Sequence, residues 1–333
     1  MSDASPRSHR TRWILSIAIG LANAYLLSRS DGGPPGYAAA DLTPLLHAAR
    51  MVLAGESPYT GATMLYPMPA LLSLIPLTPF SDLHAYAIWG GLASGLITWA
   101  AFGRHGPHGI AVTLSRCANR AIVLAQWAPW QYLGALYPGW QVLAAAKPTI
   151  GLIVWLYRPT RWAFIGGIIL VLLSFVVLPT WLNGWLGHTG RADWYVPALL
   201  VWQGGGPLLA FAVLRWRRPE ARLLLALAIV PHNFIWYDQL LLFLVPTRPR
   251  ELWSLCVLSW VSAVVANYFF QRAGIPEPAG QIAFRAPIVA LLYLPSLAMT
   301  LRRPNEGPAV PWLEGRIAGL PSWIRGSPAP AAA

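Results

Sequence analysis

AFIGGIILVLLSFVVLPTW, residues 163–181, contains no ionisable side chain. A helix needs about 20 mainly apolar residues to cross the hydrocarbon core of a bilayer. The rest of the chain is similar in character, because only 11% of its 333 residues are charged, whereas soluble domains have about 25%. The sequence therefore predicts an integral membrane protein.

Five further runs reach or approach the length of a span: Trp13–Ser28, Leu83–Phe102, Val196–Leu214, Leu252–Phe270 and Phe284–Leu301. More apolar sequence lies in residues 109–157 and 223–245, where residues 129–157 read as one broken helix or two short ones. By the length rule we expect an all-α, polytopic membrane protein of about 9–10 transmembrane helices. Residues 1–303 would form one transmembrane domain, and the Pro-, Gly- and Ala-rich residues 304–333 a cytoplasmic tail.

The net charge of +12 sets the expected orientation. In a soluble protein such a charge would suggest a nucleic-acid partner, but no nucleic-acid-binding motif accompanies it. The arginines instead lie in short segments beside the apolar runs, as the positive-inside rule describes. We therefore expect both termini to be cytoplasmic and residues 29–82 to form the first outer loop.

That loop contains ADLTPLLHAARMVLAGESPY, residues 40–59, which brings together Asp41, His47, Arg50 and Glu56. An apolar stripe with a period near 3.6 predicts a helix from Asp41 to Ala54 that ends at Gly55. Fourteen residues rise only about 21 Å, which is too short for a span. We expect an amphipathic helix that lies along the membrane surface.

Two interpretations of Asp41 are open. Its carboxylate can cap the first turn of the surface helix, since Asp is favoured at that position. Alternatively, a partly desolvated carboxylate with a raised proton affinity can act as a general base toward an attacking hydroxyl. The two roles are compatible, because a helix start fixes the position of a carboxylate.

Residues 41–77, DLTPLLHAARMVLAGESPYTGATMLYPMPALLSLIPL, resemble the first outer loop of the GT-C superfamily. They are most similar to bacterial polyprenyl-phosphate-dependent mannosyltransferases. The matching positions are Asp41, Gly55, Pro58, Tyr59, Tyr66, Pro67 and Pro69. Two looser similarities follow. Residues 124–152 resemble a segment with a Gln at a helix end, here Gln126, and a later Lys-Pro, and residues 231–246 resemble a polar cluster at an outer membrane edge. The chain departs from the pattern at Ala125, where a Gly is expected.

The resemblance implies an inverting glycosyltransferase in the inner (plasma) membrane of a bacterial cell, with Asp41 as catalytic base. The donor would be a polyprenyl-phosphate sugar, with mannose favoured, and the acceptor a lipid or glycan at the outer face. No cofactor is implied, and no cluster of metal ligands is visible, although assistance by a divalent metal stays open.

Five ionisable residues stand within or beside apolar sequence, where such residues are costly. Lys147, the only lysine in the chain, can bind a donor phosphate as a point charge or snorkel toward the headgroups. His232 and Asp238 can bind donor phosphate or sugar, or belong to a polar loop anchored by aromatic residues. Arg116 and Arg120 share a helix face and suit either the donor phosphate or the cytoplasmic start of a span.

The expected site therefore has Asp41 as base. Its expected substrate-binding residues are His47, Arg50, Glu56, Tyr59, Tyr66, Gln126, Lys147, His232 and Asp238. A transporter or lipid flippase without transferase activity is the main alternative, since it also has intramembrane charges and broken helices. A non-catalytic relative that only binds lipid is a third possibility.

Overall fold

The computed structural model describes residues 6–29, 41–60, 64–189, 196–232, 235–273, 280–307, 319 and 321–327. Most of these residues are helical, and none of them forms a strand beyond two isolated bridges. The chain divides into two compact units. Unit 1 comprises residues 1–155, 159–193 and 236–240, and unit 2 comprises residues 156–158, 194–235 and 241–333. The expected all-α fold is confirmed for the described residues.

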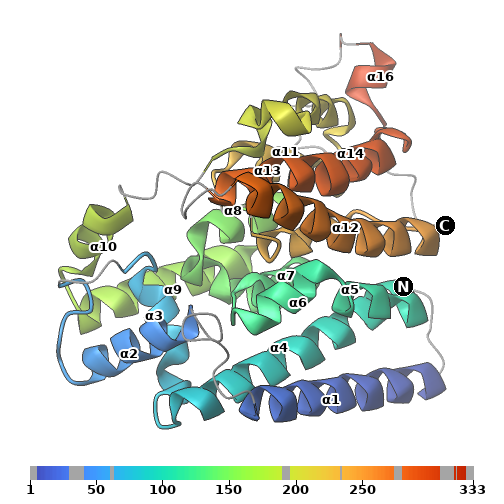
Figure 1. The fold of residues 1–333 in the computed structure, drawn as a ribbon. Coiled ribbons are helices and arrows are strands. Elements are labelled where there is room, and N and C mark those ends of the chain that lie inside the picture. The colour runs from blue at the N-terminus through green and yellow to red at the C-terminus, as the bar shows by residue number, and fades with distance from the viewer. Residues whose placement is uncertain are drawn as a thin grey trace. The chain divides into compact units, whose positions relative to one another are not determined.

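Unit 1 holds the N-terminal helices (Figure 1). Its α-helices are α1 (Pro6–Ser28), α2 (Leu42–Leu53), α3 (Met68–Leu74), α4 (Asp82–His105), α5 (Ile110–Thr113), α6 (Arg116–Val123), α7 (Ala128–Leu136), α8 (Pro148–Tyr157), α9 (Arg161–Val177) and α10 (Trp181–Thr189). The 3-10 helices between them are η1 (Ile75–Leu77), η2 (Gly106–Gly109) and η3 (Pro138–Ala146). The last two residues of α8 are grouped with unit 2.

Helices α1 and α4 lie side by side along their lengths (Figure 1). Glycine makes this close approach possible. A Cβ on Gly91 would lie 2.7 Å from the Cβ of Ala24, and a Cβ on Gly20 would lie 3.0 Å from the carbonyl oxygen of Gly91. Small residues four apart on both helices, such as Gly91 and Gly95, are typical of helix pairs that pack within a membrane.

The apolar sequence of residues 109–157 is divided into short helices. Pro129, Pro138 and Pro148 each stand at the first or second position of a new helix, α7, η3 and α8 respectively. Proline is tolerated there because it has no N–H to donate, whereas within a helix it removes a hydrogen bond. The expected break in residues 129–157 is confirmed, and none of these pieces is long enough to span a bilayer.

The apolar run of residues 163–181 is also bent. Helices α9 and α10 meet at an angle of 104°, and together they are long and apolar enough to cross a membrane. Leu178 has an extended backbone and Pro179 follows it, and a residue before proline is disfavoured in helical geometry. The pair therefore forms either a broken span or a re-entrant segment.

Unit 2 holds the C-terminal helices. They are η4 (Ala198–Leu200), η5 (Trp202–Gly204), η6 (Gly206–Arg215), α11 (Pro219–Ile229), η7 (Asp238–Leu244), α12 (Pro249–Ala273), α13 (Gly280–Ile288), η8 (Val289–Tyr293, a π-helix), α14 (Leu294–Leu301) and α16 (Ser322–Arg325). Residues 238–240 of η7 are grouped with unit 1. The span expected at Val196–Leu214 is not one helix, because Gly205 has a φ of +78° and Pro207 follows Gly206.

Three helical segments of the described residues are long and apolar enough to cross a membrane: Asp82–Thr113, Pro249–Phe269 and Phe284–Leu301. The bent pair α9–α10 makes up to four. The expected count of nine or ten is therefore not confirmed, since it counted apolar runs that prolines and glycines divide into short helices.

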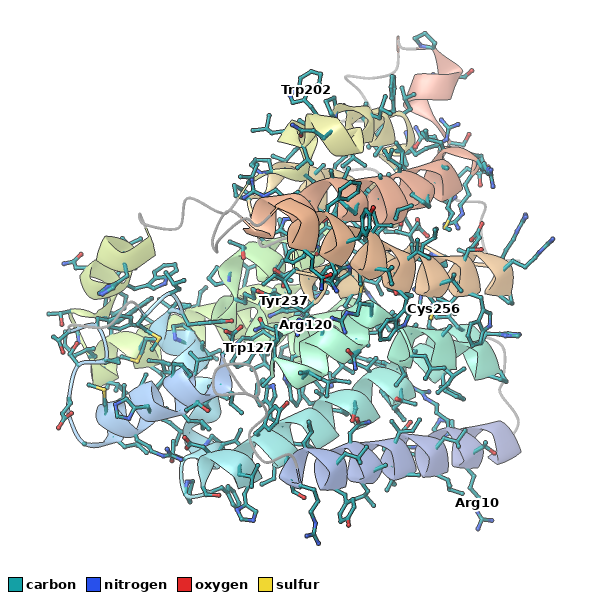
Figure 2. The ribbon with its side chains drawn as sticks, in the orientation of Figure 1. Arg10, Arg120, Trp127, Trp202, Tyr237 and Cys256 are labelled. Carbon is teal, nitrogen blue, oxygen red and sulfur yellow. The ribbon has the colours of Figure 1, made fainter. Side chains whose placement is uncertain are left out.

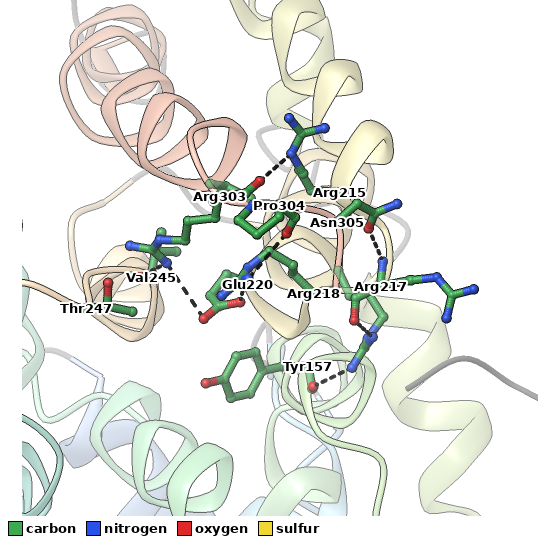
Figure 3. A network of polar contacts seen from close by, with 12 residues as sticks. Tyr157, Arg215, Arg217, Arg218, Glu220, Val245, Thr247, Arg303, Pro304 and Asn305 are labelled. Atoms are coloured by element: carbon green, nitrogen blue, oxygen red, sulfur yellow. Dashed lines mark hydrogen bonds and ion pairs between the residues drawn. The ribbon is translucent and has the colours of Figure 1, made fainter. Parts of the chain in front are cut away.

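Unit 2 contains an arginine-rich network of hydrogen bonds and ion pairs (Figure 3). Arg217 is 1% exposed, and its guanidinium donates to the carbonyl oxygens of Arg325 and Gly307. Arg303 donates to Glu251 at 2.8 Å and lies 3.7 Å from Glu220. The described part of the expected tail therefore contacts buried arginine, while most of residues 304–333 lies outside the described residues.

Candidate functional site

Asp41 stands at the N-terminal end of α2, but its carboxylate does not cap the helix. It makes no side-chain hydrogen bond to the first turn. The half-buried carboxylate instead accepts a hydrogen bond at Oδ2 from the Nε2 of Gln126. Its Oδ1 makes no hydrogen bond to any residue that the structure describes. Asp41 therefore occupies the N-cap position of α2, but the hydrogen bond by which its carboxylate was expected to cap the helix is absent.

The amphipathic character of α2 fixes the position of Asp41. The buried side chains of the helix are Leu42, Leu45, Leu46, Ala48, Ala49 and Val52. This face packs against α3. The helix ends as the sequence predicts, because Gly55 has a φ of +77° and the N–H groups of Gly55 and Glu56 return to Val52 and Met51. This is a Schellman motif, in which glycine supplies the left-handed residue.

Gln126 follows the end of α6. This helix also ends in a Schellman motif, but alanine and not glycine is the left-handed residue. Ala125 has a φ of +52°, and the N–H groups of Ala125 and Gln126 donate to the carbonyls of Ile122 and Ala121. Alanine at this left-handed position costs roughly 1–2 kcal/mol. It is also the position at which the resembled family has a glycine. Strained backbone of this kind often occurs at functional sites.

Two tyrosines that follow α2 in the chain connect to Gln126. The hydroxyl of Tyr59 donates to the carbonyl oxygen of Tyr66 at 3.2 Å. The hydroxyl of Tyr66 in turn lies 3.4 Å from the Oε1 of Gln126, a long hydrogen bond. With Oε1 facing a hydroxyl, the amide Nε2 is directed at Asp41. Burial raises the pKa of Tyr59, which keeps its hydroxyl protonated as a donor.

A buried ion pair lies in the same unit. The Nζ of Lys147 is 2.6 Å from the Oδ1 of Asp238, whose side chain is 0% exposed. The ammonium also lies 4.7 Å from the ring centroid of Tyr237, a cation–π distance. A buried ion pair stabilises a fold weakly at best, because desolvation offsets the attraction. Its presence therefore favours a functional role.

The charges of this group act on Asp41. Burial raises the pKa of the Asp41 carboxyl, the nearby Lys147 lowers it, Asp238 raises it again and Arg120 lowers it. The net direction is upward from the ordinary value of 3.8. We call Asp41, Arg120, Gln126, Lys147 and Asp238 the polar cluster; its two carboxylates face two cations. Figure 2 labels Arg120 and Tyr237.

The cluster includes four of the ten residues expected from the sequence, namely Asp41, Gln126, Lys147 and Asp238, with Tyr59 and Tyr66 supporting it. His47 and Glu56 are exposed on and after α2. Arg50 holds α2 to the start of α4, through an ion pair with Asp82 at 2.7 Å and a bond to the carbonyl oxygen of Phe80. The structure does not bring these three residues into the cluster.

His232 belongs to unit 2. Its Nδ1 lies 2.8 Å from the carbonyl oxygen of Val230 and its Nε2 lies 2.8 Å from the hydroxyl of Tyr293. A carbonyl oxygen only accepts, so Nδ1 carries a proton toward Val230. His232 is 1% exposed and has a hydrogen-bond partner at both ring nitrogens.

Arg120 is the member of the cluster that the sequence does not assign, since it suits either the donor phosphate or the cytoplasmic start of a span. The spacing of Arg116 and Arg120 shows that they share a helix face, but it does not show whether that face is buried in the protein. The signal that could have found it is Gln126, six residues later, because the polar end of so short a helix keeps both residues in one neighbourhood.

The described residues contain no group of three or more His, Cys, Asp or Glu side chains able to hold a metal ion. The side chains of the cluster itself offer two carboxylates, an amide and two cations. No protein-family model, curated protein or solved structure matches the chain.

Proposed function

We propose that the chain is a membrane glycosyltransferase that moves a sugar, with mannose favoured, from a polyprenyl-phosphate donor to a hydroxyl of a lipid or glycan. The observation that carries the proposal is Asp41. Its carboxylate is partly buried, is held by Gln126 rather than by its own helix, and has a raised pKa. A base with a raised pKa accepts a proton more readily from a hydroxyl.

The proposed step is a single displacement. Asp41 takes the proton of the acceptor hydroxyl through Oδ1, the acceptor oxygen bonds to the anomeric carbon, and the bond from that carbon to the phosphate oxygen breaks. One displacement inverts the anomeric configuration. The leaving phosphate gains negative charge, which Lys147 and Arg120 stabilise, and such stabilisation is usually a large part of catalysis.

The surroundings of Asp41 favour chemistry at a membrane face. Helix α2 is a 12-residue amphipathic helix, and α1 and α4 pack through glycine as membrane helices do. The resemblance of residues 41–77 to the first outer loop of the GT-C superfamily supports the outer face, the lipid-linked donor and a bacterial plasma membrane. No cofactor is part of the proposal, and a divalent metal is left open.

The test uses the wild-type protein in nanodiscs with polyprenyl-phosphate mannose, glucose or arabinose and total membrane lipids as acceptors. We expect transfer of one labelled sugar, with an anomeric configuration in the product opposite to that in the donor. Retention of configuration would overturn the single displacement. If no donor is consumed and labelled lipid crosses the bilayer of proteoliposomes instead, the chain is a lipid transporter.

A further inference from the structure

The Lys147–Asp238 pair offers more hydrogen-bonding capacity than it uses. Lys147 has three ammonium protons, and its one hydrogen bond among the described residues goes to the Oδ1 of Asp238. The other carboxylate oxygen, Oδ2, is buried and has no hydrogen-bond partner in the part of the chain that the structure describes. An unpaired buried acceptor is costly, more so when it is charged. The pair thus has spare donors and a spare acceptor side by side.

These two needs match one kind of ligand. An anion satisfies the spare ammonium protons, and a hydroxyl satisfies Oδ2. Both oxygens of a carboxylate share one carbon, and Nζ lies 2.6 Å from Oδ1, so one small ligand can supply both the anion and the hydroxyl. In a glycosyl phosphate the phosphate oxygen on C1 and the hydroxyl on C2 are carried by adjacent carbons, which suits such a pair.

We propose that Lys147 and Asp238 form a two-point receptor for a glycosyl phosphate, in which Lys147 binds the phosphate and the Oδ2 of Asp238 accepts a hydrogen bond from the C2 hydroxyl. This inference rests on the proposed function and adds to it the group of the sugar that is recognised, the C2 hydroxyl. Lys147 keeps a side-chain exposure of 12% while Asp238 has none, so the phosphate approaches from the lysine side. Asp238 then sets specificity at C2, where mannose and glucose differ.

The alternative role of Asp238 is that of a plain counterion to Lys147. A counterion affects every phosphate probe alike, whether or not the probe carries a C2 hydroxyl. The two roles therefore separate in a binding experiment that changes the carboxylate on the protein and the hydroxyl on the probe independently, as in a double-mutant cycle.

The probes are the farnesyl-phosphate esters of mannose, glucose and 2-deoxyglucose, with farnesyl phosphate as the sugar-free probe. The 2-deoxy compound is the common reference for both sugars, because they differ only at C2. Dissociation constants are measured for the full chain in nanodiscs, as wild type, Asp238→Asn and Lys147→Gln. Binding needs no turnover, so this result is independent of whether transfer occurs.

Wild type should bind one of the two sugars roughly 10- to 100-fold more tightly than the 2-deoxy probe, as expected for a hydrogen bond to a charged group. In Asp238→Asn that ratio should fall to within about threefold, while Lys147→Gln should weaken all four probes. Equal binding of the sugar and 2-deoxy probes by wild type would overturn the proposal without any variant. An equal effect of Asp238→Asn on all four probes would also overturn it, in favour of the counterion.

Asp238→Asn leaves a buried lysine unpaired, and such a change can be strongly destabilising. The double variant Lys147→Gln/Asp238→Asn removes both charges and controls for this. It should remain folded, and it should show no discrimination at C2. If it still discriminates between the sugar and the 2-deoxy probe, Asp238 is not the residue that reads the hydroxyl.

Discussion

At the scale of single residues, the account depends on how one carboxylate is held. Asp41 accepts its hydrogen bond from Gln126, 85 positions away in the chain. Burial raises the pKa of the Asp41 carboxyl, whereas a donor to the ionised form of a carboxyl lowers its pKa. We therefore predict that Gln126 positions Asp41 and also lowers its proton affinity.

Replacing Gln126 by Ala should shift the pH dependence of transfer. In the proposed mechanism transfer needs ionised Asp41, whose pKa is raised above 3.8, so the rate should fall as the pH falls through that raised value. Loss of the amide donor raises the pKa further, and the acid limb of kcat/KM should move to higher pH. The pH–rate profile of the variant in nanodiscs measures this shift.

Gln131→Ala is the matched control, because Gln131 is also buried and donates to a backbone carbonyl, that of Leu143, at 3.0 Å. It should lower stability and leave the acid limb where it is. A shift of equal size in both variants would show that the effect comes from general loosening of unit 1 and not from Asp41.

Ala125→Gly should stabilise the protein. Glycine adopts a φ near +52° without the steric cost that alanine has there, so the free energy of unfolding should rise by about 1 kcal/mol. Ala121→Gly, a change of the same residue type inside α6, should lower it by about 1 kcal/mol. Denaturant unfolding in detergent micelles measures both, and two changes of the same sign would contradict the left-handed conformation at Ala125.

At the scale of helices, the close packing of α1 on α4 is the clearest structural requirement. Gly91→Ile should destabilise the pair by roughly 1–3 kcal/mol, the usual cost of overpacking, because even a Cβ there lies 2.7 Å from Ala24. Gly187→Ala is the control, since a Cβ there meets no atom within 4 Å. Thermal unfolding in the same detergent compares them. A Gly91→Ile variant as stable as Gly187→Ala would rule out this packing.

The helices also show where prediction from sequence succeeds. The bounds of α2 agree with the expected helix to one residue at each end, because its apolar period and Gly55 are local signals. The contact between Asp41 and Gln126 is not predicted, since Gln126 comes from the end of another helix. The Lys147–Asp238 pair is not predicted either, since its members are 91 positions apart. The span expected at Val196–Leu214 failed because its length and hydropathy fit a span, whereas Gly204, Gly205, Gly206 and Pro207 break the helix.

At the scale of the whole molecule, the segments that pass as spans are Asp82–Thr113, Pro249–Phe269, Phe284–Leu301 and the bent pair α9–α10. Hydropathy counts apolar residues but not the turns within them, so a sequence with 31 prolines and 29 glycines yields more expected spans than long helices. The orientation expected for the chain rests on charge alone, since exposed arginines such as Arg10, labelled in Figure 2, adjoin the apolar helices.

The expectation that residues 29–82 face outward can be tested directly. Cysteine introduced at the exposed Glu56 should react with a membrane-impermeant maleimide added to intact cells, whereas cysteine at the exposed Arg302 should react only in inverted membrane vesicles, as the positive-inside rule requires. Both native cysteines, Cys117 and Cys256, are buried, which keeps the background low. Labelling of both positions from the same side would contradict the proposed orientation.

The central claim is that Asp41 is the base of a glycosyl transfer, and the most direct measurement is the transfer rate of Asp41→Asn beside Asp82→Asn in nanodiscs. Asp82 is the matched control, because it also lies at the start of a helix and its carboxylate pairs with Arg50 of α2. The account predicts that Asp41→Asn folds, binds donor and loses at least 100-fold in transfer rate, the contribution expected of general base catalysis, while Asp82→Asn keeps its rate within about threefold. Equal rates in the two variants would contradict the claim and place the base elsewhere.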